Sequence, residues 1–276
     1  MARWFRPLAA VFSVLVALAV GVSVPGAAQS PEARPGQPGW SRAASLCFVW
    51  NGEPKPGETV HWTGVCENGR ASGPGELSWH YDGKTELYEG EMRDGKRHGR
   101  GTYVWANGDR YEGEYRDGHE HGRGTFVWAN GDRYDGEWRN GNRHGYGTVV
   151  TANGGRFDGE WLDDNRDGRG TMVWASGSRY DGEWRDDKQH GRGTYVWASG
   201  NRYDGEWRNG KQHGRGTWAG ENGDRYDGEW REGLADGIGD YSSAGDGETY
   251  SGLWHGGCFR DGGRRAAVGV PMTSCP

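Results

Sequence analysis

A glutamate recurs every 23 residues through most of this chain, and such a ladder of carboxylates is a candidate for acid–base chemistry. Its members are Glu91, Glu114, Glu137, Glu160, Glu183, Glu206 and Glu229. Glycoside hydrolases use two carboxylates about 5–9.5 Å apart, and copies two strands wide would place equivalent side chains about 9–10 Å apart. Identical copies do not offer the two different environments that separate an acid from a base. Arginines such as Arg192 share the face, which favours cross-strand ion pairs. We expect no catalytic residue, with a hydrolase using one of these glutamates as a remote alternative.

A histidine ladder follows the same spacing. It consists of His98, His121, His144, His190 and His213. Side chains about 9–10 Å apart cannot share one zinc ion, whose ligands lie about 2 Å from it, so we expect each histidine to brace a turn.

One turn offers a weak calcium candidate. Asp163, Asn165 and Asp167 fit the opening of a calcium-binding loop, but Trp174 stands where that loop has its bidentate glutamate. The sequence therefore predicts no metal site beyond this candidate, and no cofactor.

Both ladders belong to a sequence repeat with the central motif Tyr-x-Gly-Glu-Trp. Its copies begin at Tyr88, Tyr111, Tyr134, Phe157, Tyr180, Tyr203, Tyr226 and Tyr250. A degraded copy begins at Trp62. A fixed period of this length indicates a stack of small units, each unable to bury its apolar face alone. Such stacks bind or space other molecules more often than they catalyse.

Each copy is predicted to form a strand, a turn, a second strand and a second turn. Two runs with alternating aromatic residues are separated by Gly, Asn, Asp and Ser clusters, and some turns contain Asn-Gly, a strong hairpin signal. We predict an all-β fold: an elongated, single-layer antiparallel array of β-hairpins, with about eight 23-residue repeats plus the degraded N-terminal copy. Alternation places Tyr180, Gly182 and Trp184 on one face, the aromatic face, and Asp181 and Glu183 on the opposite, polar face.

The aromatic face carries the candidate binding residues. A single sheet cannot cover all of its rings, and exposed aromatic surface marks interaction sites; the competing interpretation is that the rings form the only core of the array. The candidates for a binding groove are Tyr134, Trp138, Trp161, Tyr180, Trp184, Tyr203, Trp207 and Trp230, with a second row at Trp105, Trp128, Trp174 and Trp197.

The N-terminus has a different composition. Arg3 and Arg6 precede an apolar run from Leu8 to Val24 and a small-residue Gly-Ala-Ala site, the pattern of a secretory signal peptide over residues 1–28. An uncleaved membrane anchor is the alternative. We expect an exported protein, periplasmic or extracellular.

The four cysteines, Cys47, Cys66, Cys258 and Cys275, lie outside the regular repeats. An even count in an exported chain predicts disulfides. Eight copies separate the ends of the array by on the order of 75 Å, whereas bridged Cα atoms lie within about 7 Å. Within one chain this leaves Cys47–Cys66 and Cys258–Cys275, and intermolecular bridges are the alternative.

The composition limits the partners. The 276 residues include 53 glycines and only 33% hydrophobic residues, with a formal net charge of −6. An acidic exported chain binds nucleic acid and anionic lipid poorly. We expect no nucleic-acid partner and consider lipid binding unfavourable.

The pattern Tyr-Glu/Asp-Gly-Glu-Trp-x-x-Gly-x-x-His-Gly-x-Gly-Thr-Tyr resembles the MORN (membrane occupation and recognition nexus) repeat. The resemblance implies a non-catalytic array used for protein contacts, self-association or tethering. It predicts a Pro/Gly-rich linker and cap at residues 29–59, the repeat array at 60–262 and a C-terminal cap at 263–276. We expect a scaffold that binds a protein or itself, with an envelope polysaccharide as the alternative ligand. Asp164 and Asp187, which replace the turn glycine, depart from the pattern.

Overall fold

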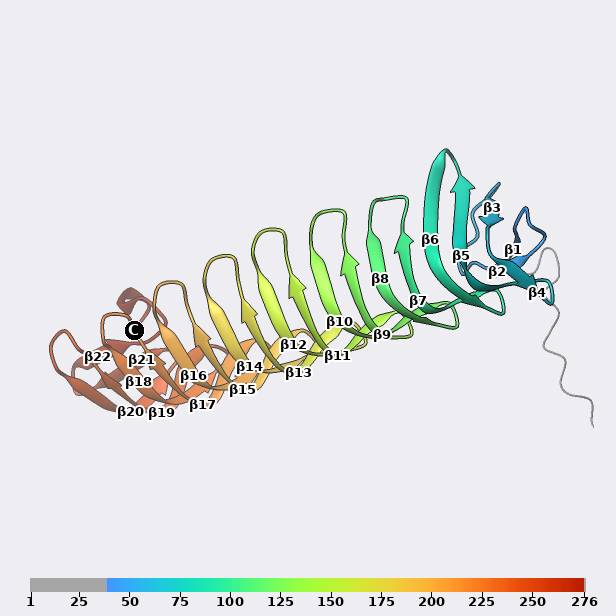
Figure 1. The fold of residues 1–276 in the computed structure, drawn as a ribbon. Helices are drawn as coiled ribbons and strands as arrows, with labels where there is room; N and C mark the ends of the chain where they lie inside the picture. Colours follow the sequence, from blue (N-terminus) through green and yellow to red (C-terminus); the bar gives the residue numbers. More distant parts are fainter. Residues whose placement is uncertain (1–38, 276) are drawn as a thin grey trace, which may run out of the picture. The chain divides into compact units, whose positions relative to one another are not determined.

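The computed structural model describes residues 39–275, which contain 22 β-strands and one short 3₁₀ helix, η1 (Met272–Ser274) (Figure 1). The strands before the repeats are β1 (Trp40–Arg42), β2 (Phe48–Trp50), β3 (Thr59–Trp62), β4 (Val65–Glu67) and β5 (Arg70–Tyr81). The first strands of the hairpins are β6 (Lys84–Arg93), β8 (Arg110–Arg116), β10 (Arg133–Arg139), β12 (Arg156–Leu162), β14 (Arg179–Arg185), β16 (Arg202–Arg208), β18 (Arg225–Arg231) and β20 (Thr249–His255). Their second strands are β7 (Lys96–Val104), β9 (His119–Val127), β11 (Asn142–Val150), β13 (Asn165–Val173), β15 (Lys188–Val196), β17 (Lys211–Ala219), β19 (Leu234–Ser242) and β21 (Cys258–Asp261), followed by β22 (Arg264–Ala267).

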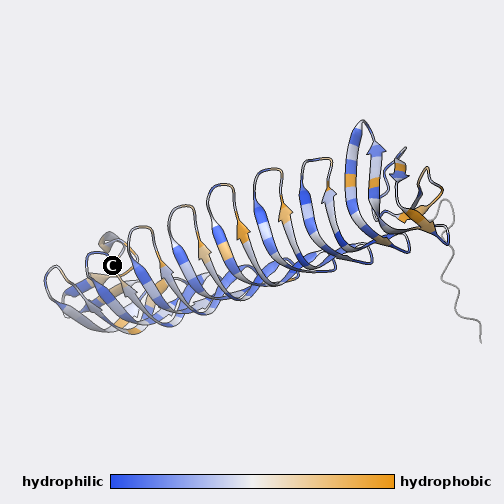
Figure 2. Ribbon diagram, viewed as in Figure 1, coloured by the Kyte–Doolittle hydropathy of each residue, from blue (hydrophilic) through white to orange (hydrophobic). Residues whose placement is uncertain are grey.

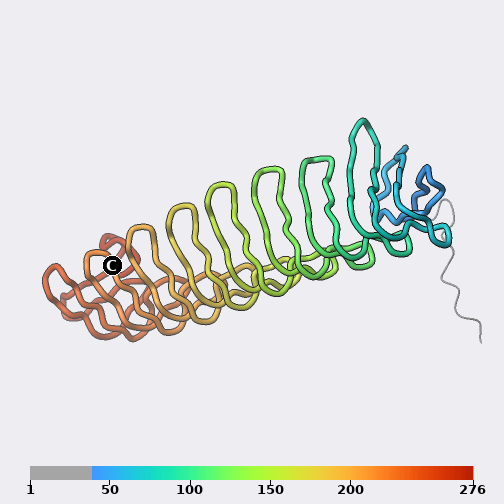
Figure 3. The backbone as a smooth tube through the Cα atoms, viewed as in Figure 1, coloured from blue at the N-terminus to red at the C-terminus, as the bar shows by residue number. Residues whose placement is uncertain are grey.

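Each strand from β5 to β22 pairs antiparallel with the next one along the chain. The backbone trace therefore passes back and forth once per repeat (Figure 3). The predicted fold class is confirmed: residues 39–275 are almost entirely β, in an open single sheet of hairpin repeats. Among these residues no helix is long and apolar enough to span a membrane. The predicted signal peptide at 1–28 lies outside the described residues.

A row of paired glycines explains how the aromatic rings can lie flat on the backbone. Gly182 pairs with Gly193 across the hairpin, and Gly193 pairs with Gly205 of the next repeat. A Cβ atom at Gly193 would collide with the Tyr180 ring. That ring thus covers bare backbone, and its hydroxyl donates to the carbonyl of Glu183 at 2.9 Å.

The core is a zigzag of rings that ties each repeat to the one before it. Trp184 meets Tyr180 of its own repeat edge-to-face at 5.1 Å and Phe157 of the preceding repeat at 5.4 Å. Its indole Nε1 donates to the carbonyl of Gly170 at 3.0 Å. Edge-to-face pairs are favourable because the ring edge is positive and the ring face negative. The array therefore gains most of its packing between neighbours, as expected of a repeat protein.

Hydropathy colouring fits this kind of core. The repeat strands are mostly hydrophilic or intermediate in Figure 2, because the Tyr and Trp side chains that form the core have intermediate hydropathy.

One disulfide lies at each end of the sheet. Cys47–Cys66 and Cys258–Cys275 have Cα atoms 5.6 and 5.5 Å apart, which confirms the predicted pairing. Among the described strands, β3 and β22 at the two ends have four residues each. Short end strands limit edge-to-edge pairing with another chain.

The degraded copy keeps the geometry of the repeats. Trp62 is 1% exposed, and its ring covers Gly64 and Gly75 as the Tyr180 ring covers its own glycine pair. Its Nε1 donates to the carbonyl of Val65 at 3.0 Å. A tryptophan can therefore replace the first tyrosine of the repeat without loss of this bond.

Candidate functional site: the aromatic and polar faces

The eight rings predicted to line a binding groove are buried in the chain itself. Each is at most 7% exposed, and they are Tyr134, Trp138, Trp161, Tyr180, Trp184, Tyr203, Trp207 and Trp230. They are the members of the core zigzag, because neighbouring repeats cover both sides of each ring. These side chains offer a partner little surface of their own. They form the core against which the partly buried rings pack.

The accessible aromatic surface comes from the turns that directly follow the second strands. Trp105, Trp128, Trp174 and Trp197, which we call the second-strand row, are only partly buried against the core. Trp174 packs on Tyr195 of the next repeat at 5.1 Å, and Tyr195 in turn packs on Trp197 at 4.6 Å. Thr151 and Gly220 interrupt the row. The row thus consists of two pairs of indoles that pack against the buried core.

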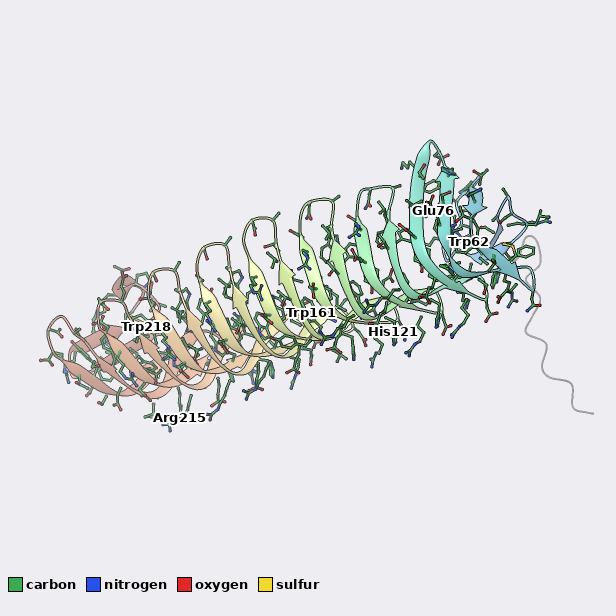
Figure 4. The ribbon with its side chains drawn as sticks, viewed as in Figure 1. Trp62, Glu76, His121, Trp161, Arg215 and Trp218 are labelled. Carbon is green, nitrogen blue, oxygen red and sulfur yellow. A yellow bond between two sulfur atoms is a disulfide. The ribbon has the colours of Figure 1, made fainter. Side chains whose placement is uncertain are left out.

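The two faces differ in chemistry along a single strand. Trp218 and Arg215 both belong to β17 and lie on opposite sides of the sheet (Figure 4). The arginine is exposed, whereas the tryptophan packs against the core. The strand alternation predicted from the sequence therefore holds for the second strands as well.

The glutamate ladder has a backbone partner on the polar face. Two extra residues in β15 shift its register against β14 after Gly182, and Oε1 of Glu183 accepts the backbone N–H of Arg192 at 3.0 Å. The same bond recurs at Glu114, Glu137, Glu206 and Glu229. Gly191, with φ of +56°, lies directly against the Glu183 carboxylate, and a Cβ atom there would collide with it.

The expected ion pairs of these glutamates with arginines such as Arg192 are therefore wrong. Among residues 39–275 the arginine that begins each first strand from β8 to β18 pairs with the acidic residue two positions later, as Arg202 does with Asp204 at 2.6 Å. The bulge explains the difference, because it turns each carboxylate toward a backbone donor. Each of these carboxylates thus bonds to the backbone of its own bulge.

The histidine ladder packs between repeats without a hydrogen bond to the next turn. Nδ1 is buried and makes no hydrogen bond within the described residues at His98, His121 and His213. Nδ1 of His144 lies 3.6 Å from the carboxylate of Asp163 in the next turn. Burial, reinforced by the charge of Arg116, lowers the pKa of His121. A direct bond to the next turn forms where aspartate replaces histidine: Asp236 accepts the N–H of Gly256 at 3.2 Å.

The calcium candidate is engaged with other side chains. Asp163 lies 3.5 Å from Arg139, and Asp164 accepts from Arg143 at 3.0 Å. Asp167 accepts the N–H of Asp186 at 3.4 Å. Within residues 39–275 no group of three or more His, Cys, Asp or Glu side chains is placed to hold a metal ion.

The structure adds a feature that the repeat pattern did not reveal. A hollow of about 250 Å³ is lined by Trp50 of β2 together with Trp79, Tyr103 and Trp105. Trp79 occupies the second-strand position of the degraded copy, so its spacing from Gly75 was a usable signal. Trp50 comes from outside the repeats, and nothing in the periodicity places it there.

The comparisons with curated proteins and with solved structures give no match or only a distant one. A comparison with curated proteins found no match. Among solved structures, the TCP domain of SAS-4 (dCPAP) of Drosophila melanogaster, in complex with a proline-rich motif of Ana2 (dSTIL), is 12% identical with a TM-score of 0.33, covering 55% of this chain and 82% of that one. The TCP10 domain of Danio rerio CPAP is also 12% identical, with a TM-score of 0.33. The match covers 63% of this chain and 81% of that one. At these scores the likeness is too distant to bear on function.

The family comparison is decisive for the array. Seven consecutive segments match the MORN repeat: residues 88–110, 111–133, 134–156, 157–179, 180–202, 203–225 and 226–247. The copies that begin at Trp62 and Tyr250 fall outside the match. The matched segments run without a gap over more than half of the sequence, and the chain therefore belongs to the MORN repeat family.

Proposed function

We propose that this chain is an exported, non-catalytic binding module that holds a protein partner on its aromatic face. The observation that carries the proposal is the second-strand row, four partly buried indoles on a base of buried rings. Tryptophan is enriched among the residues that dominate protein interfaces. A rigid base keeps the cost of ordering these side chains on binding low.

Export rests on two features of the chain. The signal-like composition of residues 1–28 and the two disulfides at the ends of the sheet are both typical of exported proteins. The carboxylates of the polar face support a non-catalytic role, because the ladder glutamates bond to backbone N–H groups.

A retention experiment tests the proposal. The purified chain is immobilised and exposed to the envelope fraction of its source, beside a Trp174→Ala/Trp197→Ala variant. The matched control is Leu253→Ala, since Leu253 is 68% exposed and lies on the polar face. Circular dichroism and a thermal melt confirm that each variant is folded.

We expect one discrete protein to be retained by the unaltered chain and by the Leu253→Ala control, and lost from the double variant. Loss from the control alone would transfer the interaction to the polar face and overturn the proposal. Retention of glycan alone, dependent on the two tryptophans, would replace it with polysaccharide binding.

A further inference from the structure

The polar face carries a row of arginines whose guanidinium groups have no partner among the described residues. The members occupy equivalent positions of the second strands, and we call them the arginine row: Arg100, Arg123, Arg169, Arg192 and Arg215. All five residues are exposed, and within residues 39–275 none of their side chains forms a hydrogen bond or an ion pair. Arg215 lies on the side of the sheet opposite to Trp218 (Figure 4). The row therefore presents five charged donor groups to solvent.

The carboxylates that flank the row already have partners. Asp204 pairs with Arg202 at 2.6 Å, and Asp227 accepts from the hydroxyl of the threonine opposite it at 2.8 Å. Glu206 accepts the backbone N–H of Arg215 at 3.1 Å. Around Arg192 and Arg215 the charged groups without a partner are thus the donors. A guanidinium is a donor only, so a ligand that binds here must bring acceptors.

The row borders hollows in the surface of the sheet. One hollow of about 220 Å³ is lined by Arg192 and Arg215 together with paired glycines and Thr217. A counterpart of about 550 Å³ at the first repeats is lined by Arg100 and Arg123, again with paired glycines. Glycine has no side chain, so a ligand can approach the backbone closely at these positions. The unpartnered donors are therefore placed beside space that a ligand can fill.

An aromatic ring interrupts the row at its centre. Tyr146 occupies the position of an arginine between Arg123 and Arg169, and it is 56% exposed. Its hydroxyl donates to the carboxylate of Asp158, which fixes the ring, and the ring lines a hollow of about 350 Å³. A fixed, exposed ring can cover the apolar face of a sugar ring and remove it from water. The row thus combines charge with a surface for stacking.

The dimensions of the row favour a ligand whose anions are widely spaced. Two strands advance the array by about 9.6 Å per repeat, so equivalent guanidinium groups recur at about that distance. An extended peptide presents same-face side chains about every 6.8 Å, and duplex phosphates recur about every 3.4 Å along each strand. A densely charged chain would also place anions against Asp204 and Glu206, and the net charge of −6 would repel it. A polysaccharide with carboxylates on alternate sugars avoids both conflicts.

We propose that the arginine row binds an acidic polysaccharide with carboxylates on alternate sugars. The carboxylates pair with guanidinium groups of neighbouring repeats, a geometry in which both partners can bond through two atoms, and one sugar ring stacks on Tyr146. This site lies on the face opposite to the second-strand row. It is a second binding surface, which goes beyond the proposed function and does not depend on it.

The test is calorimetric titration of the full chain with a hyaluronan decasaccharide, which carries a carboxylate on every second sugar. Neutral cellohexaose, hexaglutamate and an oligothymidylate are the comparison ligands. Arg192→Gln/Arg215→Gln removes two charges from the row. Its matched control is Arg260→Gln/Arg265→Gln, which removes two charges from exposed, cross-strand arginines outside the repeats. Circular dichroism confirms that each variant is folded.

We expect saturable binding of hyaluronan that weakens as salt is added. The affinity falls about tenfold in Arg192→Gln/Arg215→Gln, the loss of two exposed ion pairs, and is unchanged in the control. Tyr146→Ala weakens binding about fivefold, whereas Tyr146→Phe, which keeps the ring, retains it.

Three results would overturn the inference. They are absence of hyaluronan binding, equal weakening in the two double variants, and binding of hexaglutamate, oligothymidylate or cellohexaose as tight as that of hyaluronan. The Trp174→Ala/Trp197→Ala variant should bind hyaluronan normally. If it loses its protein partner and keeps hyaluronan, both proposals stand, and each can fail without the other because they concern opposite faces.

Discussion

Arg143 clamps Asp164 of the following repeat through three bonds. Its backbone N–H and its Nε both donate to Oδ1 of Asp164 at 3.0 Å, and its Nη2 donates to the Asp164 carbonyl at 2.9 Å. The guanidinium also lies 4.2 Å from the centre of the Trp161 ring. Asp164 has φ of +71°, a conformation that favours glycine. Arg166 and Asp187 repeat the arrangement, so both departures from the turn glycine have a partner within the chain.

The clamp predicts a coupling between the two positions. Arg143→Gln should destabilise the fold by about 1 kcal/mol, because Asp164 remains in a strained conformation without its charged partner. Arg143→Gln combined with Asp164→Gly, which reproduces the Gln189 and Gly210 pair of another repeat, should recover most of the loss. Urea unfolding of the single and double variants measures the coupling. If the effects of the two substitutions on the free energy of unfolding are strictly additive, the contact between Arg143 and Asp164 does not explain the loss.

The core zigzag predicts that Trp184 and Trp174 respond differently to the same change. Trp184→Phe removes the bond to Gly170 and leaves space in a buried site, so we expect a loss of about 2–3 kcal/mol. Trp174→Phe, at a partly buried position, should cost under about 1 kcal/mol. Denaturant unfolding followed by circular dichroism compares them. Similar losses would mean that the two rows contribute equally to the core.

Phe157 is the one repeat-initial ring from Tyr88 to Tyr226 that lacks a hydroxyl. In Tyr180 and Tyr203 the hydroxyl donates to the carbonyl three residues later, at 2.9 and 3.0 Å. Phe157→Tyr should therefore gain an equivalent bond to Glu160 and raise stability by about 1 kcal/mol. A rise in the urea midpoint with an unchanged slope is the expected result. A lower midpoint would show that this copy has no room for the hydroxyl.

The buried tyrosines predict alkaline unfolding. Burial raises the pKa of Tyr180 and of Tyr203 well above the usual value of about 10. The folded chain holds these protons while the unfolded chain releases them, so the stabilisation is complete below about pH 10 and is lost as pH rises above it.

Tyrosinate absorbance followed together with circular dichroism checks this expectation. Both signals should change together, and Tyr180→Phe should reduce the dependence of stability on pH above about pH 10. Tyrosinate from these residues appearing near pH 10, in a chain that is still folded, would contradict the predicted direction.

Several features followed from the sequence because they depend on local geometry. The period of two along a strand is a backbone property, so the sharing of one face by Tyr180, Gly182 and Trp184 could be predicted without a structure. The pairing of Cys47 with Cys66 followed from the length of the array. The turn residues predicted the hairpins, because Gly and Asn tolerate the left-handed conformations that tight turns require.

Other features were determined only by the tertiary structure, because they depend on contacts between repeats and with the N-terminal cap. Trp184 is buried because Phe157 and Tyr180 cover it from two different repeats, which no single copy reveals. Glu183 meets a backbone N–H because of a shift in register at the bulge, and alternation alone suggested an arginine. Trp50 lines the same hollow as Trp105 because a segment outside the repeat bonds to the first repeat, through the N–H of Trp50 and the carbonyl of Gly95. Periodicity determines which face a side chain occupies, but only the packing of neighbouring segments determines how much of it remains accessible.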